Sequence, residues 1–189
     1  FYTAVQYLSF AMVGIPYMGV GRNLAYRKSL FMQQGGFTSH YGIRSGDDDL
    51  FINRVAKKKN TAVVADPGSF TYSVPKSSFG KWITQKRRHY TTGTHYRFIH
   101  KLLLGILNLS FPLFWVAFIL LLCWKFAWVI VLGVLLLKWI SQFIIFSGIA
   151  RRLRESDLTG WIVVMEWLMI LVNAGILLSN LIARPRKWK

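Results

Sequence analysis

Acidic residues are scarce in this sequence, which carries seven Asp and Glu against 24 Lys and Arg and has a formal net charge of +17 over 189 residues. Charged residues make up 16% of the chain, whereas a typical soluble domain has about 25%. Cysteine is nearly absent too, because Cys123 stands alone, and this excludes an internal disulfide. The chain is 53% hydrophobic, so its basic charge fits the cytosolic flanks of a membrane protein. We therefore expect membrane lipids as partners, and no nucleic acid.

Three long apolar runs fill the second half of the chain. The runs are residues 102–124 without a charge, residues 126–149 broken only by Lys138, and residues 158–183 broken only by Glu166. At about 1.5 Å per residue, each run is long enough to cross a hydrocarbon core of about 30 Å. A domain of this size has no room for three buried helices of that length. We therefore predict that residues 101–189 form an all-α region with about three transmembrane helices.

The basic residues that flank these runs predict the orientation in the membrane. Lys and Arg are frequent between residues 81 and 101, and the sequence ARRLRE separates the second run from the third. Cytosolic flanks carry such an excess of positive charge. We expect an integral protein of the cell's inner membrane, with its catalytic part in the cytosol. The basic tail RPRKWK would lie outside after a third full crossing, so either the third run is re-entrant or the charge rule fails there.

Lys138 and Glu166 are the charges inside the apolar runs. Measured along the helices from the loop at residues 150–157, Lys138 lies about 18 Å deep and Glu166 about 13 Å deep. A long lysine side chain spans that difference, so we predict an ion pair within the membrane. The alternative is that Lys138 extends alone toward the polar interface and that Glu166 faces an interface.

The first hundred residues have the pattern of a mixed α/β domain. The sequence YMGVGRNLAYRK is typical of a buried strand, and SLFMQQGGF predicts a short helix that ends at its two glycines. The sequence LFINRVAKKKN has apolar residues at helical spacing. The sequence TAVVADPGSFTYSV predicts a strand, a turn at Asp66-Pro67-Gly68 and a second strand.

Three of the seven acidic residues are adjacent, in SGDDDLFINR at residues 45–54. Asp47, Asp48 and Asp49 fall at the start of the predicted helix, where one Asp is enough to cap the backbone N–H groups. Sites for hard cations usually alternate their ligands along the chain, and this run does not, so we assign it no metal. A catalytic carboxylate that acts as a general base is the remaining interpretation.

A second polar cluster lies in KWITQKRRHY, at residues 81–90. On a helix, Gln85, Arg88 and His89 stand at positions i, i+3 and i+4 and share one face. A basic amphipathic helix lying on anionic lipid is the alternative interpretation. That alternative accounts for Lys86 and Arg87, but it gives no reason for a glutamine and a histidine in line with Arg88.

The order of these motifs resembles the membrane-integrated glycosyltransferases of family 2. Gly46-Asp47-Asp48 is similar to the acidic pair of that family, and Gln85 follows Asp48 by 37 residues and opens a motif similar to Q-x-x-R-W. The resemblance implies that Asp48 is the catalytic base with Asp47 as its partner. It implies that Gln85, Arg88 and His89 bind the diphosphate or the acceptor, although His89 stands where the family has tryptophan.

The resemblance also implies a fold and a domain organisation. GVGRNLAYRKSLFMQQGGF is similar to the acceptor-side strand of the family, which adds Arg22 and Asn23 to the binding residues. Residues 1–78 would be the C-terminal half of a glycosyltransferase A type α/β domain, and residues 79–100 an amphipathic interfacial helix. We expect the chain to be the C-terminal part of a larger enzyme and to be inactive alone, because the nucleotide-binding half has no counterpart in it.

The activity implied by the resemblance is an inverting transfer of a sugar, of the hexosyltransferase type. The donor would be a nucleotide sugar, and the acceptor a hydroxyl of a lipid or glycan. A divalent cation, Mg or Mn, is expected with its ligands in the missing N-terminal half. Two other classes stay open: a non-catalytic membrane protein with a lipid-binding basic helix, and a transporter that uses Lys138 and Glu166. His40, His95 and His100 are assigned no role.

Overall fold

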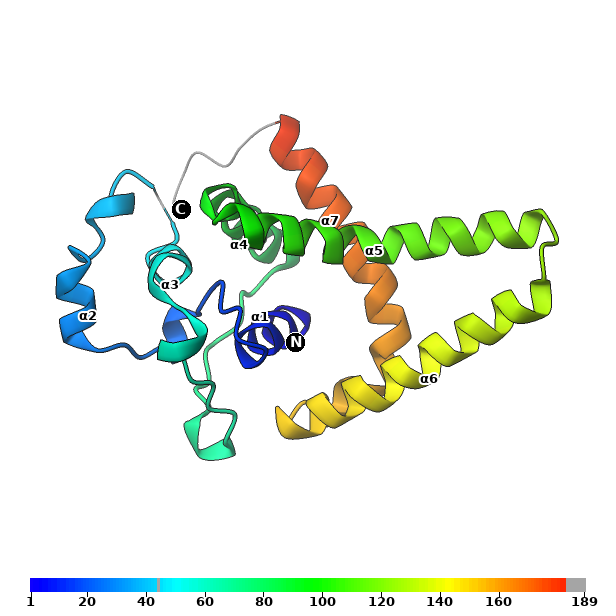
Figure 1. Cartoon of the computed structure of the whole chain (residues 1–189), viewed down its shortest axis with the longest axis horizontal. Coiled ribbons are helices and arrows are strands. Elements are labelled where there is room, and N and C mark those ends of the chain that lie inside the picture. The colour runs from blue at the N-terminus through cyan, green and yellow to red at the C-terminus, as the bar shows by residue number, and fades with distance from the viewer. Residues whose placement is uncertain (44, 183–189) are drawn as a thin grey trace. The chain divides into compact units, whose positions relative to one another are not determined.

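The structure, a computed structural model, describes residues 1–43 and 45–182 of the chain. Residue 183 at the end of the third apolar run and the tail RPRKWK lie outside the described residues. The helices are α1 (Tyr2–Met12), α2 (Lys28–Gln33), α3 (Asp49–Val55), α4 (Phe79–Thr92), α5 (Phe98–Cys123), α6 (Trp128–Arg152) and α7 (Ile162–Ile182) (Figure 1). The chain divides into two compact units. The head unit is Phe1–Lys101 with the end of α7 from Ala174, and the membrane unit is Leu102–Asn173.

The predicted α/β fold of residues 1–78 is wrong, because the described residues contain helices and short 3-10 turns but no strand. The segments expected to be strands are locally extended, with Leu24 at φ −135° and ψ 129° and Thr61 at φ −123° and ψ 134°. A strand also needs a neighbour that exchanges backbone hydrogen bonds with it. Side chains, and not paired backbones, join residues 22–23 to residues 69–71. Asn23 Nδ2 donates to the Ser69 carbonyl at 3.1 Å, and Thr71 Oγ1 donates to the Arg22 carbonyl at 3.0 Å.

One helix end and one turn of the head unit lie where the sequence predicts them. Helix α2 ends just before Gly35 and Gly36, whose φ values of 70° and 61° are left-handed and suit glycine. At the predicted Asp66-Pro67-Gly68 turn, the Asp66 carboxylate accepts from the Gly68 N–H at 3.0 Å. Short-range signals therefore identified turns and helix ends correctly, although they gave the wrong fold class.

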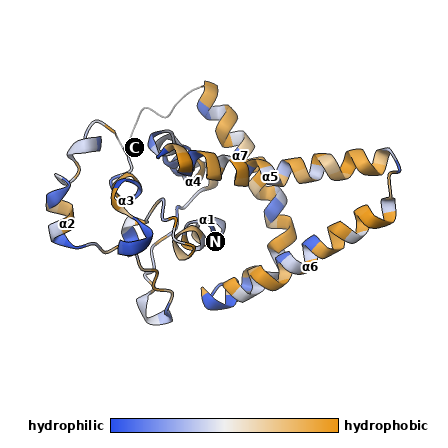
Figure 2. Ribbon diagram, in the orientation of Figure 1, coloured by the Kyte–Doolittle hydropathy of each residue, from blue (hydrophilic) through white to orange (hydrophobic). Residues whose placement is uncertain are grey.

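The membrane unit is built from the three apolar helices that the sequence predicts. Three candidate spans are long and apolar enough to cross a membrane: Phe98–Cys123, Trp128–Arg152 and Ser156–Ile182. Figure 2 shows the hydrophobic colouring along α5, α6 and α7. Most of their apolar side chains are exposed, among them Leu137 and Leu171, as expected of helices that are solvated by lipid.

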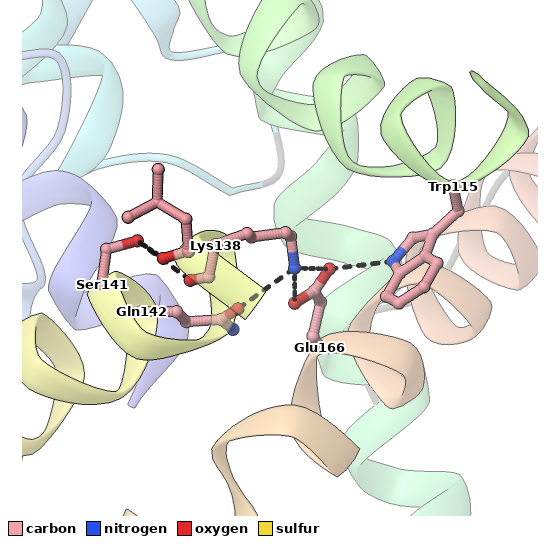
Figure 3. Close-up of polar contacts among 6 residues, drawn as sticks. Trp115, Lys138, Ser141, Gln142 and Glu166 are labelled. Carbon is pink, nitrogen blue, oxygen red and sulfur yellow. Dashed lines mark hydrogen bonds and ion pairs between the residues drawn. The ribbon is translucent and has the colours of Figure 1, made fainter. Parts of the chain in front are cut away.

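The predicted ion pair inside the membrane unit is confirmed. Lys138 Nζ lies 2.6 Å from Glu166 Oε2 and 2.8 Å from Glu166 Oε1, which joins α6 to α7 (Figure 3). Lys138 also donates to Gln142 Oε1, one turn along α6, at 3.1 Å. Glu166 accepts a further hydrogen bond from Trp115 Nε1 on α5 at 3.0 Å. One buried polar network therefore connects all three helices.

Aromatic rings surround this network. Lys138 Nζ lies 5.1 Å from the ring centroid of Phe114 and 5.3 Å from that of Trp115, and the Trp115 and Trp167 rings are 4.4 Å apart. Glu166 is only 2% exposed. A lone charge at this depth is costly. The opposite charge, the hydrogen bonds and the ring faces offset that cost together.

We predict that removing one charge of the Lys138–Glu166 pair destabilises the protein more than removing both. Breaking a buried pair typically costs about 3–5 kcal/mol, because the remaining charge is left uncompensated. We expect Lys138→Met and Glu166→Gln each to lower the thermal midpoint in detergent. The double variant should be more stable than the worse single variant, and Lys81→Met, at an exposed lysine, should have little effect. A double variant that is no more stable than the worse single variant would show that the charges are not partners.

Candidate functional site

The acidic cluster forms the turn that starts α3. Gly46 enters it with φ 97°, and a Cβ at this position would lie 2.7 Å from Asp49 Oδ1, so both the conformation and the space require glycine. Asp48 is the N-cap, and its Oδ1 accepts from the Asp49 N–H at 2.8 Å. The prediction that the cluster lies at a helix N-terminus is therefore confirmed.

Asp48 also fastens a second segment to this turn. Its Oδ2 accepts from the Gly21 N–H at 2.7 Å, and a Cβ on Gly21 would lie 3.3 Å from that oxygen. Asp48 is half-buried and Asp47 is exposed. The Asp48 carboxylate is thus held in one orientation by backbone donors while it stays within reach of a ligand from solvent.

Asp49 has a different environment, being only 2% exposed. Its Oδ2 accepts from Thr92 Oγ1 at 2.6 Å and from the Tyr96 hydroxyl at 2.7 Å. Its Oδ1 has no hydrogen-bond partner among the described residues. Burial, and then the negative charge of Asp49, raise the pKa of Tyr96 far above its usual range. The third carboxylate of the cluster therefore joins the start of α3 to the end of α4.

Asn53 continues this connection one turn later on the same face of α3. Its Nδ2 donates to the Tyr17 carbonyl at 2.7 Å and lies 2.9 Å from His100 Nδ1, and its Oδ1 accepts from the Arg97 N–H at 3.0 Å. Asn53 is 3% exposed and His100 is 5% exposed. We name these contacts of Asp49 and Asn53 the polar joint.

Sequence reasoning missed the polar joint. Asp49 was treated as a neighbour of the catalytic pair, and His100 was given no role. The signal that was available is the spacing of Asp49 and Asn53, four residues apart in a short helix whose other residues, apart from Arg54, are apolar. This spacing places two polar side chains on one face. Their partners, at residues 92–100, are too distant in sequence for a local pattern to identify.

Helix α4 carries the second polar cluster. The Ser78 hydroxyl caps it by accepting from the Lys81 N–H at 3.4 Å, and it ends at Thr92, where a turn at Gly93–His95 separates it from α5. It is therefore shorter than the predicted segment 79–100. Its helical geometry places Gln85, Arg88 and His89 on one face, as their spacing predicted.

The electrostatics of His89 connect this face to the acidic turn. Surrounding protein atoms exclude part of the water around the His89 ring. This burial lowers the pKa of His89 below its usual value. Asp49 and Asp48 oppose that shift, whereas Arg88 and Lys86 add to it. His89 therefore lies within electrostatic range of the carboxylates of α3 and is neutral at pH 7.

The remaining predicted binding residues lie beside the Gly21 turn. Arg22 donates to Ser73 Oγ at 2.5 Å, and Asn23 holds the Ser69 carbonyl. Both side chains therefore bind residues 69–73 to the loop at Gly21, which Asp48 also contacts. Arg22 also contributes to lowering the pKa of Lys86 on α4, after burial, which is the larger cause. The structure thus brings Arg22 into the electrostatic range of α4.

A divalent cation does not fit the part of the chain that the structure describes. No group of three or more His, Cys, Asp or Glu among those residues converges as a metal site. The carboxylates of Asp48 and Asp49 point to different partners, one to backbone N–H groups and the other to Thr92 and Tyr96. We therefore derive no chemical step through a metal ion.

Comparison with known proteins gives one match. The family model described as glycosyl transferase family group 2 matches residues 2–178, a range that contains the acidic turn, α4 and most of the three apolar helices. No curated protein and no solved structure matches the chain.

We predict that Tyr96→Phe destabilises the protein through Asp49. The change removes one hydroxyl and leaves the buried carboxylate with one hydrogen bond fewer, and bonds to charged groups contribute about 1.5–3 kcal/mol. Unfolding of the purified protein in detergent measures the loss. The matched control is Tyr72→Phe, at a side chain that is 84% exposed, and equal effects of the two changes would contradict the polar joint.

The same variant tests the raised pKa of Tyr96. Because the folded protein favours the protonated hydroxyl, this stabilisation is complete below the unfolded-state pKa of about 10 and is lost as the pH rises further. We expect the wild-type protein to lose stability above about pH 10 more steeply than Tyr96→Phe. Parallel stability curves for the two proteins in that range would contradict the assignment.

Proposed function

This chain belongs to glycosyl transferase family group 2, and from that premise we propose that it carries the acceptor-side chemistry of a membrane-bound, inverting glycosyltransferase. The family match and the three apolar helices fit a membrane glycosyltransferase. We propose a nucleotide sugar as donor, a hydroxyl of a lipid or glycan as acceptor, and a hexosyl group as the sugar. The single observation that carries the proposal is that Asp49 of the acidic turn accepts a hydrogen bond from Thr92 at the end of α4, the helix that carries Arg88 and His89.

The proposed reaction assigns a separate task to each of these elements. Asp48, with Asp47 beside it, removes the proton from the acceptor hydroxyl as its oxygen attacks the anomeric carbon. The bond from that carbon to the donor phosphate breaks, and the nucleoside diphosphate leaves with the electron pair. Arg88 offsets the charge that develops on the leaving group. Gln85 and the neutral His89 offer hydrogen bonds to the diphosphate or the acceptor.

Several features support the proposed binding of donor and acceptor near this site. The Asp48 carboxylate is fixed by two backbone donors, which is the preorganisation that a general base needs, and each oxygen keeps a lone pair for a proton. Arg22 and Asn23 hold the neighbouring loop, where we propose that they contact the acceptor or the diphosphate. A divalent cation stays a prediction, for which the described residues offer no site.

The side of the membrane that we propose for the head unit follows from the Lys and Arg residues beside the apolar helices. The basic residues before α5 and those at the end of α6, Arg151 and Arg152, favour the cytosolic side of the inner membrane for the head unit. A transporter that uses Lys138 and Glu166 is less consistent with the structure, since these two groups bind each other within a closed network.

We predict that Asp48→Asn abolishes sugar transfer by the full-length protein while its expression and membrane insertion stay normal. Asparagine keeps the size, and its one oxygen can still cap the helix start, although the hydrogen bond from the Gly21 N–H is lost. Normal expression and insertion would therefore show that the loss of transfer is chemical. Removal of a general base costs on the order of 10² to 10⁴-fold in kcat. Transfer of labelled sugar from a panel of nucleotide sugars to a lipid extract measures this, and retention of more than about a tenth of the wild-type kcat would refute the assignment.

The rival function, lipid binding by a basic helix, is tested by a second pair of variants. Arg88→Ala and Lys81→Ala each remove one positive charge from α4, and Lys81 lies two turns before Arg88 at an exposed position. We expect Arg88→Ala to lower kcat by on the order of 10² to 10³-fold, as loss of a charge-stabilising donor does, and Lys81→Ala to change it little. Equal losses, matched by weaker binding to anionic vesicles, would favour the lipid-binding function.

A further inference from the structure

Arg87 lies on a different face of α4 from the residues of the site. At about 100° per residue, its side chain points about 100° from Arg88 and about 200° from Gln85. The sequence gives it no role beyond charge toward lipid. The structure gives it a specific partner at the end of α7, within the head unit.

The partner residues are Ser179 and Asn180, which lie 92 and 93 positions further along the chain. Arg87 Nε donates to Asn180 Oδ1 at 3.0 Å, and its terminal Nη2 donates to the Ser179 carbonyl at 2.9 Å. Asn180 Nδ2 donates in return to the Arg87 carbonyl at 3.1 Å. All three residues are half-buried. We name this reciprocal set of hydrogen bonds the Arg87 clamp.

The end of α7 suits such a clamp. The Ser179 carbonyl is among the last four of the helix, which lack donors within the helix, and a guanidinium there complements the negative end of the helix dipole. Ile176, one turn earlier on the same face, is 2% exposed. The neighbouring residues on the outer face are exposed: Leu177 at 58%, Leu178 at 60% and Leu181 at 74%. One face of the last turns of α7 is therefore buried in the head unit.

The clamp gives α4 a further point of attachment, beside the hydrogen bond that Lys86 Nζ donates to Thr3 Oγ1 of α1 at 3.0 Å. Thr92 at the end of the helix binds Asp49, and Arg87 lies about 7.5 Å before it along the axis. One attachment at its end leaves a helix free to turn about its own axis, whereas a second attachment on another face fixes the rotation. The rotation of α4 decides whether Arg88 and His89 face the acidic turn.

We propose that Arg87 is a positioning residue for sugar transfer: by binding Ser179 and Asn180 it fixes the rotation of α4, so that the face with Arg88 and His89 stays beside the acidic turn that Thr92 binds. This inference rests on the proposed function. In this proposal, the end of α7 helps to hold the active site in place. The two hydrogen bonds of the Arg87 guanidinium matter more for this role than its positive charge.

The test compares Arg87→Ala, Asn180→Ala, the double variant and Arg87→Lys, with Lys81→Ala as the matched control on α4. Hydrogen–deuterium exchange of residues 79–92 in the detergent-solubilised full-length protein reports the clamp without any activity. We expect faster exchange in both single variants and no further increase in the double variant, because the two residues act as one unit. Lys81→Ala should exchange at the wild-type rate.

Kinetics of sugar transfer then test the positioning role. We expect each single variant to lower kcat by about 10- to 100-fold, the loss that a displacement of about 1 Å produces, with the KM for the donor changed less than about threefold. The double variant should match the worse single variant. Arg87→Lys keeps the charge but not the fork, so it should behave like Arg87→Ala.

The possible results distinguish the clamp, its positioning role and the proposed function. Unchanged exchange in Arg87→Ala and Asn180→Ala would refute the clamp, whatever the activity. Faster exchange with wild-type kcat would show a structural contact that does not position the site. Wild-type kinetics in Arg87→Lys with a loss in Arg87→Ala would assign the effect to charge on lipid. No transfer by the wild-type protein from any nucleotide sugar would refute the proposed function itself, while the exchange data would still decide the clamp.

Discussion

The buried carboxylate of Asp49 is the contact on which the site depends, because it fixes the start of α3 to the end of α4. The hydrogen bonds from Thr92 and Tyr96 join the acidic turn directly to the end of the helix that carries Arg88 and His89. Asn53 repeats the arrangement one turn later, with the Arg97 N–H and His100 as partners. A short helix of low intrinsic stability is thus kept in place by polar contacts that are almost fully buried.

The three adjacent carboxylates therefore have three different environments. Asp49 supports the structure from the interior, Asp48 caps the helix and presents a fixed carboxylate, and Asp47 stays exposed. This division explains why a chain so poor in acidic residues places three of them together. The Arg87 clamp extends the same principle to α4, whose orientation is set by a contact on the face that does not carry the proposed chemistry.

Long helices and the membrane network could be predicted from the sequence, because apolar length and depth along a helix are local quantities. Lys138 and Glu166 were paired correctly by counting residues from one loop. The strands were not predicted correctly, since alternation in TAVVADPGSFTYSV indicates extended backbone but not a pairing partner. Asp49 could not be distinguished from Asp48 by type or spacing; only Thr92 and Tyr96, more than forty residues away, separate them.

The measurement that tests this account most directly compares Asp47→Ala, Asp48→Ala and Asp49→Ala in the full-length protein, each scored for thermal midpoint and for sugar transfer. We expect Asp49→Ala to lower the midpoint most, because it leaves the Tyr96 hydroxyl buried without its acceptor at a cost of about 1–3 kcal/mol. Asp48→Ala should cost only about 1 kcal/mol, as loss of a helix cap does, yet abolish transfer. The account would be contradicted if Asp48→Ala transferred sugar at the wild-type rate, or if Asp49→Ala were as stable as Asp47→Ala.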